Sequence, residues 1–116
     1  MNESSARKEA ARTIIRAVNA RDAELYASVF DEQAIVQIYD GPVRVTGRAA
    51  LQENRASHFA RFPEIRCEIL HLIEIGDIVI MHDRVWLSAD VQAPVNVVEI
   101  FTFNGEGLIE KVAVIQ

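Results

Sequence analysis

One carboxylate stands on an otherwise apolar strand face near the end of this 116-residue chain. Residues 96–116 form two alternating apolar runs around a glycine-containing turn, a pattern that predicts the closing hairpin of a curved sheet. In the first run Glu99 shares its face with Val97, Phe101 and Phe103. A lone acid among aromatic side chains is unfavourable unless it is paired or functional, so Glu99 is the first candidate for chemistry.

The preceding run, residues 78–89, supplies further chemical groups. One of its faces carries His82, Arg84 and Trp86, and the other is apolar with Asp83 as its only charge. Alternating strand residues point to opposite sides of a sheet. We expect the chemistry on the face of His82, Arg84 and Trp86 rather than on the more apolar face.

An antiparallel hairpin that closes at Val91–Gln92 places Arg84 opposite Glu99. Arg84 would then bind an acid or a carbonyl group, Glu99 would act as a general base because desolvation raises its pKa, and His82 would donate or accept a proton. The alternative is a structural ion pair that only satisfies two cross-strand side chains.

Five further residues are candidates for ligand contact. Trp86 and Phe101 are expected on the wall of an apolar cavity, where the Trp86 ring would stack against a ligand. Tyr39, Asp40 and His58 are expected at its rim.

Metal, cofactor and nucleophile chemistry is not expected. The histidines at positions 58, 71 and 82 have no carboxylate at ligand spacing, so they predict no metal site. Cys67 is the only cysteine and sits in an alternating run, which predicts an inert, buried thiol. There is no glycine-rich phosphate loop and no Gly-x-Ser-x-Gly motif. We therefore expect no cofactor.

Hydrophobic periodicity and turn residues predict the elements that position these groups. Ser4 or Ser5, Asp22 and Thr46 are the expected N-caps of three helices. The helices are predicted up to about residue 19, over 23–30 and over 48–61, and the strands over 34–39, 43–45, 65–74, 78–89, 95–103 and 108–115.

Helices followed by a long meander specify an α+β domain, with three N-terminal helices on one face of a curved, mainly antiparallel sheet. We expect a single domain over residues 1–116. Both faces of the predicted sheet carry apolar residues, and helices cover only one of them. The uncovered outer face therefore predicts a homodimer.

Charge and hydropathy narrow the classes of partner. The net charge is −5, and the 12 basic residues are dispersed, which disfavours nucleic acid and anionic membranes. No apolar run approaches the ~20 residues that span a bilayer, and the N-terminus lacks the apolar core of a signal peptide. We expect a cytoplasmic protein.

Several short motifs, in this order and spacing, resemble the nuclear-transport-factor-2-like (NTF2-like) superfamily, which includes ketosteroid isomerases and limonene epoxide hydrolases. Within this superfamily the chain looks most like SnoaL-like and steroid isomerase-like domains, because of the motif at residues 59–63 and the motif at residues 81–85 that follows it. The resemblance implies a cystatin-like cone around a deep apolar cavity, often in a dimer. The motifs are Val18–Asp22, Gly47–Leu51, Phe62–Pro63, Gly76–Val79 and Phe103–Ile109.

Compared with ketosteroid isomerases, the chain keeps one catalytic group. The resemblance places their catalytic Asp at Ile38 and their oxyanion Tyr at about Ile14, whereas Glu99 stands where they carry a protonated Asp. Isomerisation by that mechanism therefore lacks its base, unless a strand bulge lets Asp40 replace it.

Compared with limonene epoxide hydrolases, the chain keeps only the arginine, as Arg84. Trp86 stands where their neighbouring Asp belongs. Their water-positioning residues fall near Val36 and Ile38, and their second Asp falls near Val114.

These observations predict a domain that binds a small, mainly apolar organic molecule and acts on it by cofactor-free acid/base isomerisation or hydrolysis. The alternative is a non-catalytic interaction or ligand-storage module. A packed interior without a pocket of a few hundred Å3 would favour that alternative.

Overall fold

A computed structural model describes residues 5–90 and 93–116 of the chain. Within them, no helix is long and apolar enough to cross a membrane. The elements in chain order are α1 (Ala6–Ala20), α2 (Ala23–Ala27), β1 (Phe30–Ile38), β2 (Val43–Thr46), α3 (Arg48–Arg61), β3 (Arg66–Ile75), β4 (Ile78–Trp86), β5 (Val95–Phe103) and β6 (Ile109–Ile115).

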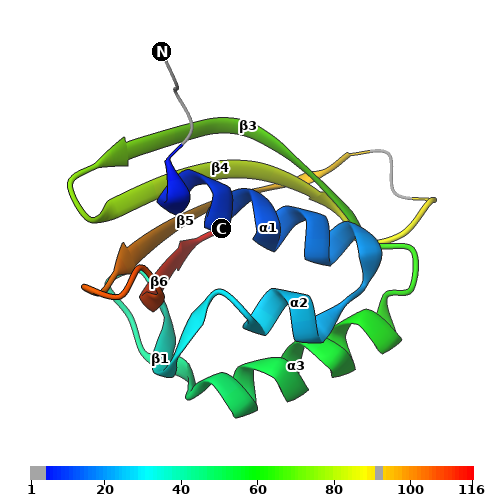
Figure 1. Ribbon diagram of the computed structural model, residues 1–116. Helices are drawn as coiled ribbons and strands as arrows, with labels where there is room; N and C mark the ends of the chain where they lie inside the picture. The colour runs from blue at the N-terminus through cyan, green and yellow to red at the C-terminus, as the bar shows by residue number, and fades with distance from the viewer. Residues whose placement is uncertain (1–4, 91–92) are drawn as a thin grey trace.

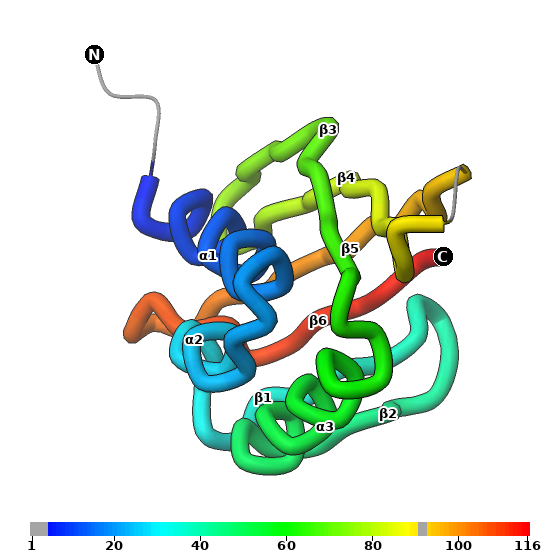
Figure 2. Tube along the Cα trace, turned by 90° about the vertical axis from the view of Figure 1, so that its right-hand side faces the viewer, coloured from blue at the N-terminus to red at the C-terminus, as the bar shows by residue number. Residues whose placement is uncertain are grey.

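The strands form one curved sheet in the order β2-β1-β6-β5-β4-β3. All neighbours are antiparallel except β1 and β6, which run parallel. In Figure 1 the long strands β3 and β4 curve over α1, while α2 and α3 lie below it. Figure 2, turned by 90°, shows the helices enclosed by the bend of the sheet. The predicted α+β cone with three helices on one face is confirmed.

Local capping explains where the helices begin. Ser5 accepts a hydrogen bond from the backbone N–H of Lys8, and Asp22 caps α2 in the same way. The alternative cap Ser4 lies outside the described residues. The third predicted cap is wrong, because Thr46 ends β2 and Gly47 caps α3 with a φ of 94°. A positive φ favours glycine, which has no Cβ to clash.

The core lies between the helices and the inner face of the sheet. Phe30, Phe101 and Phe103 are its largest fully buried side chains. Phe30 was expected at the end of the second helix, but it begins β1 and stacks on Tyr26 with ring centres 5.6 Å apart. Burying each such side chain contributes roughly 1.5–3 kcal/mol.

The pairing of β4 with β5 differs from the sequence prediction. Glu99 lies opposite Met81, and Arg84 lies opposite Asn96, so the predicted Arg84–Glu99 pair is wrong. An odd shift in register moves every side chain to the other face. In this register the more apolar face of β4 and the face of β5 that carries Val97 and Phe101 both lie against the core. The turn expected at Val91–Gln92 lies outside the described residues.

Candidate functional site

A central pocket of about 550 Å3 opens between the helices and the inner face of the sheet. Each layer contributes to its apolar wall, with Ile14 from α1, Tyr26 from α2, Leu51 from α3, Val97 from β5 and Val112 from β6. Apolar side chains of this wall exclude water from polar groups that lie among them. Two carboxyl groups line the pocket.

Asp83 on β4 and Glu99 on β5 project into the central pocket from the same face of the sheet. Asp83 lies opposite Val97, and Glu99 follows two residues later on β5, which places the two acids diagonally. Their carboxyl groups are close enough to share a hydrogen bond when one of them carries a proton. Asp83 is 2% exposed, and its Oδ1 has no hydrogen-bond partner among the described residues.

Burial makes this carboxyl pair retain a proton. It raises the pKa of Glu99 well above its ordinary value, and the charge and hydrogen bond of Asp83 raise it further. Burial also raises the pKa of Asp83, but the hydrogen bond from Glu99 counteracts this. Glu99 therefore holds the proton and Asp83 ionises first, which separates one acid from one base.

Tyr26 and Arg55 lie within the electric field of this pair. Burial raises the pKa of Tyr26, and the nearby Glu99 raises it further, so the phenol keeps its proton. The Arg55 guanidinium lies 5.6 Å from the centre of the Tyr26 ring and lowers the pKa of both Tyr26 and Glu99. The pocket therefore holds hydrogen-bond donors and acceptors close together.

The exposed end of the pocket, here called the mouth, is polar. Arg44 of β2 and Asn54, His58 and Arg61 of α3 line it, and apart from His58 they are exposed. Figure 2 shows the end of α3, the β1–β2 hairpin and the start of β5 on one side of the molecule. Burial, then the charges of Arg55 and Arg61, lower the pKa of His58.

The family model of the SnoaL-like domain matches residues 11–112. The chain belongs to the SnoaL-like domain family. Among curated proteins no sequence matches it. Solved structures with NTF2-like, cystatin-like and SnoaL-like folds resemble this SnoaL-like domain over nearly its whole length, so the predicted superfamily is confirmed.

Three of these structures illustrate the range of relatives. An uncharacterised cystatin-fold protein from Novosphingobium aromaticivorans is 28% identical, with a TM-score of 0.87 over 97% of this chain and 100% of that one. The epoxide hydrolase/cyclase-like enzyme SalBIII, which has a role in pyran ring formation in the polyether salinomycin, is 25% identical, with a TM-score of 0.78 over 98% and 92%. A SnoaL-like protein of unknown function from Burkholderia thailandensis is 18% identical, with a TM-score of 0.81 over 99% and 98%.

This SnoaL-like domain carries apolar residues at four positions that the sequence comparison aligned with catalytic groups elsewhere. Ile14, Val36, Ile38 and Val114 all line the central pocket. None of them can transfer a proton. Glu99, which the comparison aligned with a protonated Asp, lines the same pocket together with Asp83 of β4.

Three of the predicted site residues lie on the outer face of the sheet. His82 is hydrogen-bonded through Nε2 to the side-chain oxygen of Asn96 at 2.9 Å, and Arg84 donates to Glu68 at 2.7 Å. The ring of Trp86 lies 4.0 Å below the guanidinium of Arg66. The expectation that they share the cavity with Glu99 is wrong, because the register turns them outward.

The other predicted residues are distributed differently. His58 lines the mouth of the pocket as expected. Tyr39 and Asp40 are exposed on the β1–β2 turn, where Asp40 has a φ of 54°, and they do not line the pocket. Phe101 is fully buried in the core and does not line the pocket, so its predicted place on the wall is wrong.

Sequence reasoning missed Asp83, Tyr26 and Arg55 as functional groups. Asp83 carried a readable signal, since it is the only charge on an apolar strand face, as Glu99 is on the next strand. Tyr26 falls among the apolar residues of α2, and its hydroxyl gives no separate signal in the sequence. Helical spacing in α3 does not distinguish Arg55 from Asn54 as the inward residue.

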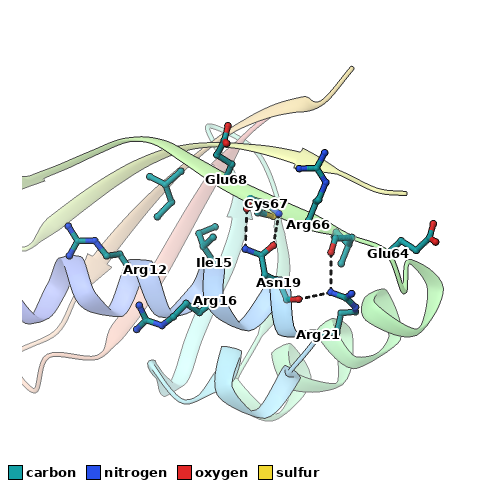
Figure 3. A pocket seen from close by; sticks show the side chains of 11 residues that line it. Arg12, Ile15, Arg16, Asn19, Arg21, Glu64, Arg66, Cys67 and Glu68 are labelled. Carbon is teal, nitrogen blue, oxygen red and sulfur yellow. Dashed lines mark hydrogen bonds between the residues drawn. The ribbon is translucent and has the colours of Figure 1, made fainter. Parts of the chain in front are cut away.

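A second hollow, of about 650 Å3, lies between α1 and the edge strand β3 (Figure 3). The amide of Asn19 donates to the Cys67 carbonyl at 3.1 Å and accepts from the Cys67 N–H at 2.7 Å. Arg21 donates to the carbonyl of Ile65. These bonds fasten the helix to the strand, and Figure 3 shows the nearby side chains of Arg12 and Arg66 pointing apart.

Cys67 and the histidines do not form a second reactive centre within the described residues. Burial raises the pKa of Cys67 to about 12, so the thiol stays protonated and is a poor nucleophile. In the described ranges no three His, Cys, Asp or Glu side chains gather as a metal site. The carboxyl pair is therefore the chemical centre of the described chain.

Proposed function

We propose that this SnoaL-like domain binds a small, mainly apolar organic molecule in the central pocket and catalyses acid/base chemistry on an oxygen function of it, without a cofactor. The observation that carries the proposal is the hydrogen-bonded Asp83–Glu99 pair on the pocket wall, in which burial keeps a proton on Glu99. Pairs of carboxyl groups whose pKa values are driven apart supply an acid and a base together.

The proposed step uses both members of the pair. The hydroxyl of Glu99 exchanges its bond with Asp83 for one with a ligand oxygen, which leaves the Asp83 carboxylate free as a base. In epoxide opening, Glu99 gives its proton to the oxygen as the C–O bond breaks. Asp83 takes the proton of the attacking hydroxyl as the new C–O bond forms. The proton then returns from Asp83 to Glu99 across their hydrogen bond.

Isomerisation next to a carbonyl fits the same groups. Asp83 would remove a proton from one carbon and return it to another, while Glu99 and the protonated Tyr26 hydroxyl stabilise the charge that develops on the oxygen in between. Epoxide opening has the additional support of SalBIII, described as an epoxide hydrolase/cyclase-like enzyme, at 25% identity.

The rival function is a non-catalytic interaction or storage module. A pocket of about 550 Å3 is in the range of small-molecule sites, which supports ligand binding over a self-filled core. A buried acid, Asp83, with a half-buried acid, Glu99, on the next strand is also unfavourable in a core that serves packing alone.

For the assembly, we propose a homodimer through the outer face of the sheet. Ile73, Ile75 and Ile115 are 49%, 67% and 43% exposed there. Arg84 and Glu68 neutralise one another on the same face. The exposed isoleucines give this face apolar area that a second copy of the chain can cover in a two-fold interface.

The test combines binding and turnover. A thermal-shift screen with terpenoid epoxides, steroids and aromatic polyketide fragments finds ligands, since a compound at 100 times its Kd stabilises a fold by about 2.7 kcal/mol. Turnover of each hit is then followed by mass spectrometry in wild type, Asp83→Asn, Glu99→Gln and the exposed control Glu53→Gln.

We expect each change in the pair to lower turnover by about 100-fold or more, with binding largely kept. The control should match wild type. Turnover that survives in both Asp83→Asn and Glu99→Gln would refute the catalytic role. Hits that bind without any turnover in wild type would favour the storage module.

A further inference from the structure

The acidic and the basic side chains of the central pocket come from different elements. The acidic side chains that line it are Asp83 and Glu99, which lie on the inner face of the sheet. The basic side chains, Arg44, Arg55 and Arg61, come from β2 and α3. Arg44 and Arg61 are exposed at the mouth.

The two arginines of the mouth have no anionic partner within residues 5–90 and 93–116. No salt bridge or hydrogen bond there involves the guanidinium of Arg44, and that of Arg61 rests on the ring of Phe62 at 5.2 Å. Elsewhere in the described chain Arg7, Arg48 and Arg84 pair with glutamates. The mouth is thus a local positive site on a chain whose net charge is −5.

The lowered pKa of His58 agrees with this charge distribution, because Arg55 and Arg61 both act on it. A neutral His58 at the mouth can donate one hydrogen bond without adding to the repulsion between cations. Asn54 provides an amide beside it. These donors suit the oxygens of an anion.

We infer that the ligand of the central pocket is an amphipathic organic anion, whose carboxylate or other acidic head group is held at the mouth by Arg44 and Arg61 while its apolar body reaches the Asp83–Glu99 pair. This inference rests on the proposed function for the site and adds the class of ligand. A head group at the mouth orients the apolar body and keeps its negative charge away from the Asp83 carboxylate. Arginine attraction also steers anions against the overall negative charge of the chain.

The probes for this inference are octanoate and 1-octanol, which share an alkyl chain and differ in the charge of the head group. Binding of each is measured by titration calorimetry at neutral pH. Two guanidiniums near a partly exposed anion should make octanoate bind about tenfold more tightly than 1-octanol. The preference should shrink as salt rises from about 0.01 M to about 1 M, because the Debye length falls from about 30 Å to about 3 Å.

The deciding variant is Arg44→Gln/Arg61→Gln, which should equalise the two probes. Its matched control is Arg12→Gln/Arg16→Gln on α1, which removes the same charge from the second hollow and should keep the preference. Glu99→Gln tests the reversed orientation, with the head group on the carboxyl pair, and should also keep it.

Equal affinity for both probes in wild type overturns the inference, as does a preference that survives in Arg44→Gln/Arg61→Gln. A preference lost in Glu99→Gln but kept in the arginine variant overturns it as well. None of these results bears on the proposed catalysis, which the turnover assay of Asp83→Asn and Glu99→Gln tests separately. Conversely, an intact octanoate preference without turnover retains the ligand class and removes only the chemistry.

Discussion

Replacing Glu99 with glutamine should remove a loss of folding stability that grows as pH rises. Burial and Asp83 raise the pKa of Glu99 above its ordinary value of 4.5. The folded chain therefore holds a proton that the unfolded chain releases as pH rises past that value. The stabilisation is fully present below 4.5 and is lost as pH rises towards the folded pKa. Over that window the free energy of unfolding falls by about 1.4 kcal/mol for each pH unit.

Urea unfolding of wild type and Glu99→Gln between about pH 5 and pH 8 measures this effect. The glutamine amide can still donate to Asp83, so the pair keeps its hydrogen bond. We expect the stability of wild type relative to the variant to decline with pH at up to about 1.4 kcal/mol per unit. Titrating groups that do not interact with Glu99, such as His58, are common to both proteins and cancel in the difference.

Glu53→Gln is the control, because Glu53 is exposed and has no ion pair among the described residues. Its stability should follow that of wild type at every pH. All samples need the same protein concentration, since a dimer would make stability depend on it. If Glu99→Gln and wild type give parallel curves, Glu99 is ionised in the fold, and the proposed acid of the site is absent.

Three further predictions follow from other parts of the fold. Arg61→Gln should raise the pKa of His58, because burial and two guanidiniums lower it; proton NMR titration measures this, and an unchanged value would mean that burial acts alone. Asn19→Ala should destabilise the fold by about 1–3 kcal/mol in urea unfolding, since two hydrogen bonds to the edge strand are lost; a smaller loss would mean that water replaces them. Ile73→Asp should shift a dimer to monomer in sedimentation, whereas Val43→Asp, also at a residue 49% exposed, should not; equal behaviour would place the interface elsewhere.

The elements of this fold could be predicted from the sequence because each depends on local signals. Ser5 and Asp22 cap helices through their own side chains, and Pro63 follows the end of α3. The β5 strand was predicted at Val95–Phe103 and is found there. Hydrophobic periodicity is read over a few residues, so distant pairing does not alter it.

The site depended on the register of two strands, which no local pattern determines. Each of β4 and β5 has apolar residues on both faces, so alternation alone allows Asp83 or Arg84 to face the helices. The polar cross-strand pair of Arg84 with Glu99 was an attractive choice for a site. The fold instead satisfies Arg84 with Glu68 of β3, a partner that the hairpin prediction did not consider.

The observed register also explains why two acids are held inside the domain. Turning Asp83 outward by one residue would also turn Val79, Met81 and Val85 away from the core, at roughly 1.5–3 kcal/mol for each side chain. Val79 and Met81 are fully buried, so their loss would outweigh the relief of one carboxyl group. Sharing a proton with Glu99 lowers the penalty further, because only one charge is then buried. The apolar side chains of β4 therefore hold Asp83 against Glu99, and the pair keeps its proton as a consequence of the packing around it.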